Sequence, residues 1–138
     1  MSLTQEQIDF YRENGYLAVE GLVPADRIQR LRAKIEQLCE DWQGEEARRV
    51  RLQQEVASGN TAAAAVAESS RTVRKFEAPA LHLDVLREHA HSDEVLGVVE
   101  ALIGKPIALF TDQALLKPPR YGSEKPPHQD NAYFQVTP

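Results

Sequence analysis

The sequence of 138 residues predicts an α+β fold in a single domain, residues 1–138. Apolar residues recur at helical spacing in much of residues 4–103. Residues 107–136 change to extended stretches separated by a loop rich in proline and glycine. Because the helices come first and the strands last, instead of alternating, the order favours an α+β arrangement.

The first helix is expected to begin at Thr4. Thr4 followed by Gln7 has the pattern of a capping box, in which the side chain of each residue satisfies a backbone N–H of the other. Gly15 supplies the left-handed backbone that commonly ends a helix. A short strand is expected next, at residues 16–20.

A second helix is expected after Pro24, since proline suits the first turn of a helix. Its apolar residues are spaced three and four apart and form one stripe, which we expect to pack against a sheet. The stripe consists of Ile28, Leu31, Ile35, Leu38 and Trp42. Cys39 lies beside it and is expected to behave as a small buried apolar residue.

Residues 43–72 are expected to form a mobile surface excursion with a weak helix. They combine high charge, an alanine run and the interrupting residues Ser58-Gly59-Asn60. Such a segment could serve as a lid over a site. A solvated helical hairpin without a functional role fits the same pattern, and the sequence leaves both interpretations open.

Beyond this segment the sequence predicts further strands and two helices. The strands are expected at residues 72–77, 107–117 and 128–136, and the helices at residues 83–89 and 92–103. Ser92 suits the N-cap of the last helix, and Gly104 with Pro106 ends it. This helix is expected to be heavily buried because of its apolar residues, Val95, Leu96, Val98, Val99, Leu102 and Ile103.

Composition argues against several classes of function. The net charge of −5 and the lack of a basic stripe make a nucleic-acid partner unexpected. The longest apolar run, residues 62–67, is too short to cross a bilayer, and no secretory signal is recognised at the N-terminus. Cys39 is the only cysteine, which excludes an internal disulfide and a cysteine-based zinc site. We therefore expect a cytoplasmic protein.

The most informative stretch is residues 127–134. His128 and Asp130 are two positions apart, so on a strand their side chains would point to the same face. A converging imidazole and carboxylate can supply two of the three protein ligands of a 2-His-1-carboxylate iron site. Such a site keeps three iron positions open, two for a bidentate 2-oxo acid and one for O₂.

The H-x-D spacing alone is a weak signal. Two further copies occur, His82 with Asp84 and His91 with Asp93. Both fall at expected helix starts, where residues two apart do not share a face and an aspartate favours the helix dipole. Only the copy at residues 128–130 lies on an expected strand after a proline-rich loop.

The stretch His128-Gln129-Asp130, followed by Tyr133-Phe134, resembles the iron-binding strand of the phytanoyl-CoA dioxygenase family. The similarity extends in the same order over nearly the whole chain. The other matching stretches are Leu3-Thr4-Gln5-Glu6-Gln7 with Phe10, Asn14-Gly15-Tyr16-Leu17, Leu102-Ile103-Gly104-Lys105-Pro106, and Leu115-Leu116-Lys117-Pro118-Pro119 with Gly122.

The resemblance implies a double-stranded β-helix, a jelly-roll of the cupin type, with an N-terminal helical layer and incomplete in this chain. It implies Fe(II) as cofactor, 2-oxoglutarate as cosubstrate, and hydroxylation of a small-molecule or acyl substrate by O₂. His128 and Asp130 match two iron ligands of the family, and Lys75 matches a lysine that reaches 2-oxoglutarate. The further residues expected to line the same cavity are Gln113, Lys117 and Asn131.

Alternatives remain for these assignments. Lys75 fits equally well as a solvated lysine at a strand edge, and the other cavity residues as structural ones. The family pattern needs a second iron histidine and an arginine beyond Pro138. We therefore expect an enzyme in the parent protein and no activity in these residues alone. The rival function is a non-catalytic, cupin-like binding or structural module. A zinc hydrolase is disfavoured because no H-E-x-x-H motif occurs.

Overall fold

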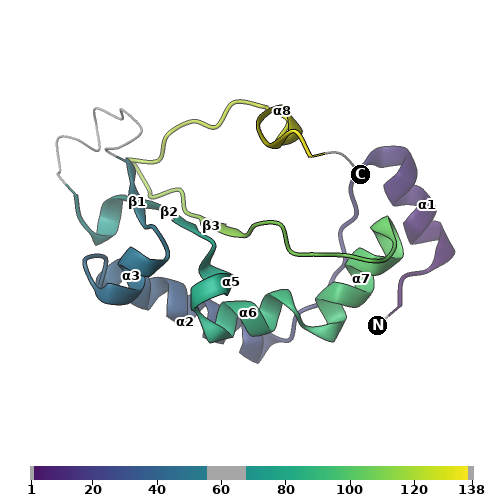
Figure 1. Ribbon diagram of the computed structural model, residues 1–138, viewed down its shortest axis with the longest axis horizontal. Helices are drawn as coiled ribbons and strands as arrows, with labels where there is room; N and C mark the ends of the chain where they lie inside the picture. The colour runs from purple at the N-terminus through teal and green to yellow at the C-terminus, as the bar shows by residue number, and fades with distance from the viewer. Residues whose placement is uncertain (1, 56–67, 137–138) are drawn as a thin grey trace.

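The computed structural model describes residues 2–55 and 68–136. Its centre is an antiparallel sheet with the strand order β1-β2-β3, formed by Gln53–Gln54, Val73–Glu77 and Gln113–Leu115. One side of the sheet carries helices, and on the other side the chain after β3 arches over to α8 (Figure 1). The helices are α1 (Gln5–Asn14), α2 (Ala25–Glu40), α3 (Glu45–Arg49), η2 (Ser70–Thr72), α5 (Pro79–His82), α6 (Asp84–Ala90), α7 (Asp93–Ile103) and α8 (Asn131–Phe134). This mixture confirms the α+β class.

Helix α1 has the ends that the sequence predicts. The Thr4 hydroxyl accepts a hydrogen bond from the Gln7 backbone N–H at 3.2 Å, and the Gln7 amide oxygen accepts from the Thr4 N–H at 2.9 Å. Gly15 ends the helix in the left-handed conformation with φ of 78°. The strand expected at residues 16–20 does not form, because this segment is not hydrogen-bonded into the sheet.

The core lies between α2 and the sheet. Leu38 of α2, Val50 after α3, and Val73 and Phe76 of β2 pack together with Leu83, all at most 3% exposed. The apolar stripe on α2 is confirmed along its second half, where Ile35 and Trp42 contact the same cluster. Its first half is more open, and Ile28 is 43% exposed.

Strand β2 contains an irregularity that lets it contribute buried core residues and also carry Lys75 on its other side. Gln53 pairs with Lys75 and Gln54 pairs with Val73, so one residue of β2, Arg74, has no partner in β1. Such a bulge interrupts the alternation of side chains. Both Val73 and Phe76 can therefore be buried, whereas Lys75 remains on the opposite side.

Several described residues of the segment 43–72 are buried, which a surface excursion does not require, whereas others, such as Arg48 and Arg71, are exposed. Its mobility stays a prediction. Ala47 and Val50 are 1% and 0% exposed, because α3 turns its apolar residues inward and its charged residues outward. Glu55 and Thr72 are also buried, and the Thr72 hydroxyl donates to the Gln54 side-chain oxygen at 2.7 Å. The rest of the segment, including the alanine run, lies outside the described residues.

The helix predicted after Ser92 is present as α7, but it is less buried than expected. Val98 is the buried residue of this helix, and Ile103 is 65% exposed. The strand expected at residues 107–117 shortens to β3, since β2 offers it a partner over three residues. No helix in the described ranges is long and apolar enough to cross a membrane.

Candidate metal and cosubstrate site

The candidate metal ligands lie in a loop and not on a strand. The strand expected at residues 128–136 is wrong: the chain turns at Asp130 and continues as α8. Asp130 has helical backbone angles, and the Asn131 side chain accepts a hydrogen bond from the Val136 N–H at 2.8 Å, which closes the turn. No neighbouring strand in the described part of the chain holds this segment extended.

His128 and Asp130 nevertheless face each other. The distance between His128 Nε2 and Asp130 Oδ1 is 3.3 Å. Both side chains are accessible, with exposed fractions of 48% and 78%. The convergence that strand alternation was expected to produce is instead produced by the turn before α8.

The second nitrogen of His128 has its own partner. His128 Nδ1 lies 2.9 Å from the carbonyl oxygen of Pro126. A carbonyl can only accept, so Nδ1 must carry the hydrogen, and in the neutral ring Nε2 keeps its lone pair. The Tyr133 ring meets the imidazole edge-on, with centroids 6.4 Å apart. These contacts turn the lone pair toward the Asp130 carboxylate.

The pair fits two ligands of one metal ion. Metal–nitrogen and metal–oxygen bonds of about 2.1 Å at a right angle would place two ligand atoms about 3 Å apart. The observed separation of 3.3 Å is close to this value. In residues 2–55 and 68–136 no group of three or more histidine, cysteine, aspartate or glutamate residues could hold a metal. In the described residues the convergence is thus limited to one imidazole and one carboxylate, and their role as metal ligands stays a prediction.

Lys75 lies on β2 with an anionic neighbour. Its ammonium is 2.7 Å from the Glu77 carboxylate, and the Lys75 side chain is 17% exposed. This hydrogen bond is the main reason why the pKa of Glu77 lies below its usual value. Gln113 is opposite Glu77 in the pairing of β2 with β3. The sheet thus brings Lys75 and Gln113 into one neighbourhood.

Two other candidates are placed differently. Asn131 begins α8 and its side chain closes the following turn, which is a structural role. Lys117 lies beyond β3 and lines a small cavity with Arg74 and Lys125. None of the contacts described here joins His128 to Lys75, so the grouping of all six candidates remains a prediction.

The structure also adds groups that the sequence did not single out. The carbonyl of Pro126 fixes one nitrogen of His128, and Tyr133 packs against the ring. A backbone carbonyl has no sequence signal, although the Pro126-Pro127 pair indicates a stiff approach to the site. Arg74, next to Lys75 on β2, lines the cavity that also contains Lys117.

The family models and the curated proteins that match this chain agree on one family. The family described as phytanoyl-CoA dioxygenase (PhyH) matches residues 11–138. Among curated proteins, the peroxisomal phytanoyl-CoA dioxygenase of Mus musculus is 34% identical over 139 residues, which cover 99% of this chain and 39% of that protein. The corresponding Homo sapiens protein is 31% identical over the same length, and a probable phytanoyl-CoA dioxygenase of Caenorhabditis elegans is 30% identical over 146 residues, 99% of this chain and 44% of that protein.

The chain spans about two fifths of the length of these relatives, and the matched stretch is their N-terminal portion. No solved structure matches it. The family match covers most of the chain, including the loop with His128 and Asp130. The chain therefore belongs to the phytanoyl-CoA dioxygenase family.

Proposed function

We propose that this chain forms the N-terminal part of an Fe(II)- and 2-oxoglutarate-dependent oxygenase that hydroxylates a small-molecule or acyl substrate. The observation that carries the proposal is the pairing of His128 Nε2 with the Asp130 carboxylate at 3.3 Å. Family membership supports it, since the relatives are named dioxygenases. The names of the relatives also make an acyl-CoA thioester the first substrate to test.

In this proposal His128 and Asp130 hold the metal, and Pro126 and Tyr133 hold His128. The bound Fe(II) would supply the redox chemistry that couples oxidation of 2-oxoglutarate to hydroxylation by O₂. The Pro126 carbonyl keeps the proton on Nδ1, so that Nε2 is available as a ligand without further rearrangement. The open position of both side chains leaves room for additional ligands.

Lys75 is the proposed contact for a carboxylate of 2-oxoglutarate. Its ammonium is mostly shielded from solvent, which strengthens its attraction for an anion, and a cosubstrate carboxylate would share it with Glu77. Gln113 lies beside this pair and could donate from its amide. A single lysine acts as a point charge without the bidentate geometry of an arginine.

The rest of the site is proposed to come from a longer parent protein. A second histidine and an arginine would complete the iron site and the cosubstrate site there. Residues 1–138 alone should then bind a metal weakly and form little succinate.

The proposal is tested by anaerobic Fe(II) titration of this chain. Binding should be lost in His128→Ala and in Asp130→Ala. His82→Ala is the matched control, because His82 and Asp84 have the same spacing at an exposed position. Loss in the first two variants with an unchanged control supports the proposal. Equal binding by all variants would contradict it and favour a non-catalytic module.

A longer parent protein gives the functional test. Succinate formation should appear in the parent and disappear on His128→Ala. A parent that forms succinate as fast after His128→Ala would show that the ligand assignment is wrong.

A further inference from the structure

A small cavity lies beside the end of β3, and apart from Lys117 none of its lining residues is a candidate for the iron or cosubstrate site. Its volume is about 100 Å³, and Leu115 and Leu116 form its apolar wall. Three cationic residues from separate segments line it: Arg74 from β2, Lys117 after β3, and Lys125 from the returning loop. The remaining lining residues are Glu55 and Ser123.

The loop that closes the cavity is held in a defined shape. The backbone N–H groups of Tyr121 and Gly122 donate to the Pro118 carbonyl at 3.3 and 2.9 Å, which reverses the chain. The Ser123 hydroxyl then donates to the Glu55 carboxylate at 2.6 Å. Glu55 is 2% exposed, so this bond attaches the loop to the interior of the protein.

Gly122 allows Lys117 to lie close to this turn. A Cβ at position 122 would overlap Lys117 Cγ and would come within 3.1 Å of the Pro118 carbonyl oxygen. Glycine removes that overlap, and the stem of Lys117 packs directly on the turn. The shape of the loop, and not only the flexibility of the Lys117 side chain, therefore places Lys117 at the cavity.

The charges around the cavity are not balanced. Among the described residues, the side chains of Arg74, Lys117 and Lys125 form no hydrogen bond or ion pair. Arg74 is partly buried, and Lys117 and Lys125 lie at the exposed rim of the cavity. Arg27, by contrast, pairs with Glu94. Bringing like charges together is unfavourable unless an anion offsets them. The Glu55 carboxylate can offset one of the three positive charges.

We propose that this cavity binds one phosphate group, either inorganic phosphate or the terminal group of a phosphomonoester. Three cations and one carboxylate leave a net charge of about +2, which matches a phosphate dianion. The volume of about 100 Å³ is well below the roughly 300–1,000 Å³ that encloses a drug-sized ligand, so it suits a single small group. This site goes beyond the proposed function and needs no iron.

The test is a titration of the metal-free chain with inorganic phosphate at constant ionic strength. Amide NMR spectra are recorded at each phosphate concentration. Saturable shifts are expected at residues 115–125. Lys117→Gln and Lys125→Gln should each weaken binding about 5- to 10-fold, between the effect of an exposed ion pair and that of a charge-assisted hydrogen bond. Lys125→Arg should retain binding because it retains the charge.

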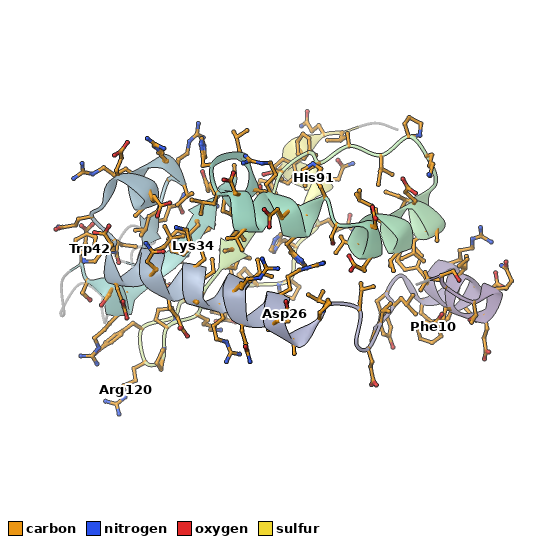
Figure 2. All side chains as sticks on the ribbon, turned by 90° about the horizontal axis from the view of Figure 1, so that it is seen from below. Phe10, Asp26, Lys34, Trp42, His91 and Arg120 are labelled. Carbon is orange, nitrogen blue, oxygen red and sulfur yellow. The ribbon has the colours of Figure 1, made fainter. Side chains whose placement is uncertain are left out.

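Arg120→Gln is the matched control. Arg120 belongs to the same loop but projects away from the protein, as Figure 2 shows, and its loss should change binding less than 2-fold. Gly122→Ala keeps every charge and should still weaken binding, because it displaces Lys117. Unchanged resonances of α2 and β2 would verify that each variant is folded.

Two outcomes would overturn the proposal. Shifts that do not saturate, or an effect of Arg120→Gln as large as that of Lys125→Gln, would mean general attraction to positive charge. Binding of 2-oxoglutarate at the same amides in preference to phosphate would assign the cavity to a carboxylate. The iron titration is independent of both outcomes, so failure of the oxygenase proposal would leave this result unchanged.

Discussion

The helical layer and the C-terminal segment use apolar residues in opposite ways. Where α2, α3 and the strand β2 meet, the apolar residues Leu38, Val50, Val73 and Phe76 are almost fully buried. Across residues 104–136 many comparable residues are about half exposed or more. They include Leu109 at 50%, Phe110 at 67%, Leu115 at 63%, Tyr133 at 77% and Val136 at 49%.

The difference follows from how each element satisfies its backbone. A helix closes its hydrogen bonds within itself and needs only one neighbouring face for its apolar stripe. An extended segment needs a partner strand along its whole length before its side chains acquire a common face. Residues 107–112 have no such partner in the described chain, whereas β3 pairs with β2 over three residues. The C-terminal segment is thus attached at a few points instead of being packed throughout.

Removing Phe76 should give the largest loss of stability. Phe76 is 0% exposed at the centre of the core, and Phe76→Ala should lower the free energy of unfolding by about 3–5 kcal/mol. The control is Phe110→Ala, whose ring is 67% exposed and meets Phe134 edge-on. It should cost no more than about 1.5 kcal/mol. If urea denaturation showed equal losses in the free energy of unfolding for both variants, the two regions would not differ in packing.

Val50 tests whether the segment after α3 is part of the core. Val50 is 0% exposed, and its carbonyl accepts a hydrogen bond from the Glu77 N–H at 2.7 Å. Val50→Ala removes two buried methyl groups and should cost about 1.5–3 kcal/mol. Val136→Ala removes the same groups at a position that is 49% exposed and should cost far less. If Val50→Ala were neutral, the segment would behave as the surface excursion that the sequence predicts.

Helix α1 allows the contribution of a helix cap to stability to be measured apart from core packing, because none of its residues is buried. Thr4→Ala removes one half of the capping box and should cost about 1 kcal/mol. Thr4→Ser keeps the hydroxyl and should restore stability. Circular dichroism during thermal unfolding measures both. A neutral Thr4→Ala would mean that contact with α7 alone maintains this helix.

Acid should loosen the connection between α2 and α7. The Arg27 guanidinium hydrogen-bonds both Glu94 oxygens, at 3.1 and 3.3 Å, and lowers the Glu94 pKa to about 2. The folded pKa lies below the unfolded value, so the contribution is complete above the usual pKa and is lost as pH falls toward 2.

The variants Glu94→Gln and Arg27→Gln should each flatten the pH dependence of stability in this window, and the double variant should add little. His89 acts at higher pH, since burial lowers its pKa and its protonation opposes folding. An undiminished slope between pH 4.5 and 2 in Glu94→Gln would contradict the role given to this pair.

The features that could be predicted from the sequence are those that depend on residues close together along the chain. Thr4 with Gln7, the left-handed Gly15 and the start of α7 after Ser92 all agree with the structure. Strand β1 could not be predicted, because Gln53-Gln54 shows no apolar alternation and is recognised only beside β2. The burial of Val50 was hidden in the same way by the charged residues around it.

The candidate site shows the same limit. The convergence of His128 and Asp130 was anticipated, but for a reason that does not apply, since a turn and not a strand produces it. The exposed Asn131 could not be distinguished from a cavity residue until its bond to Val136 was known. The iron and cosubstrate roles of these residues remain predictions for the titrations described above.

The start of α5 has a consequence for the order of folding. The Asp112 backbone oxygen accepts from the Ala78 N–H at 2.9 Å, and its carboxylate accepts from the Ala80 N–H at 2.8 Å. Helix α5 has four residues, too few to be stable alone, and its cap comes from 32 positions further along the chain. A nascent chain that has not yet reached Asp112 lacks this cap. We therefore expect α5 to form late, after the segment that carries β3 has docked.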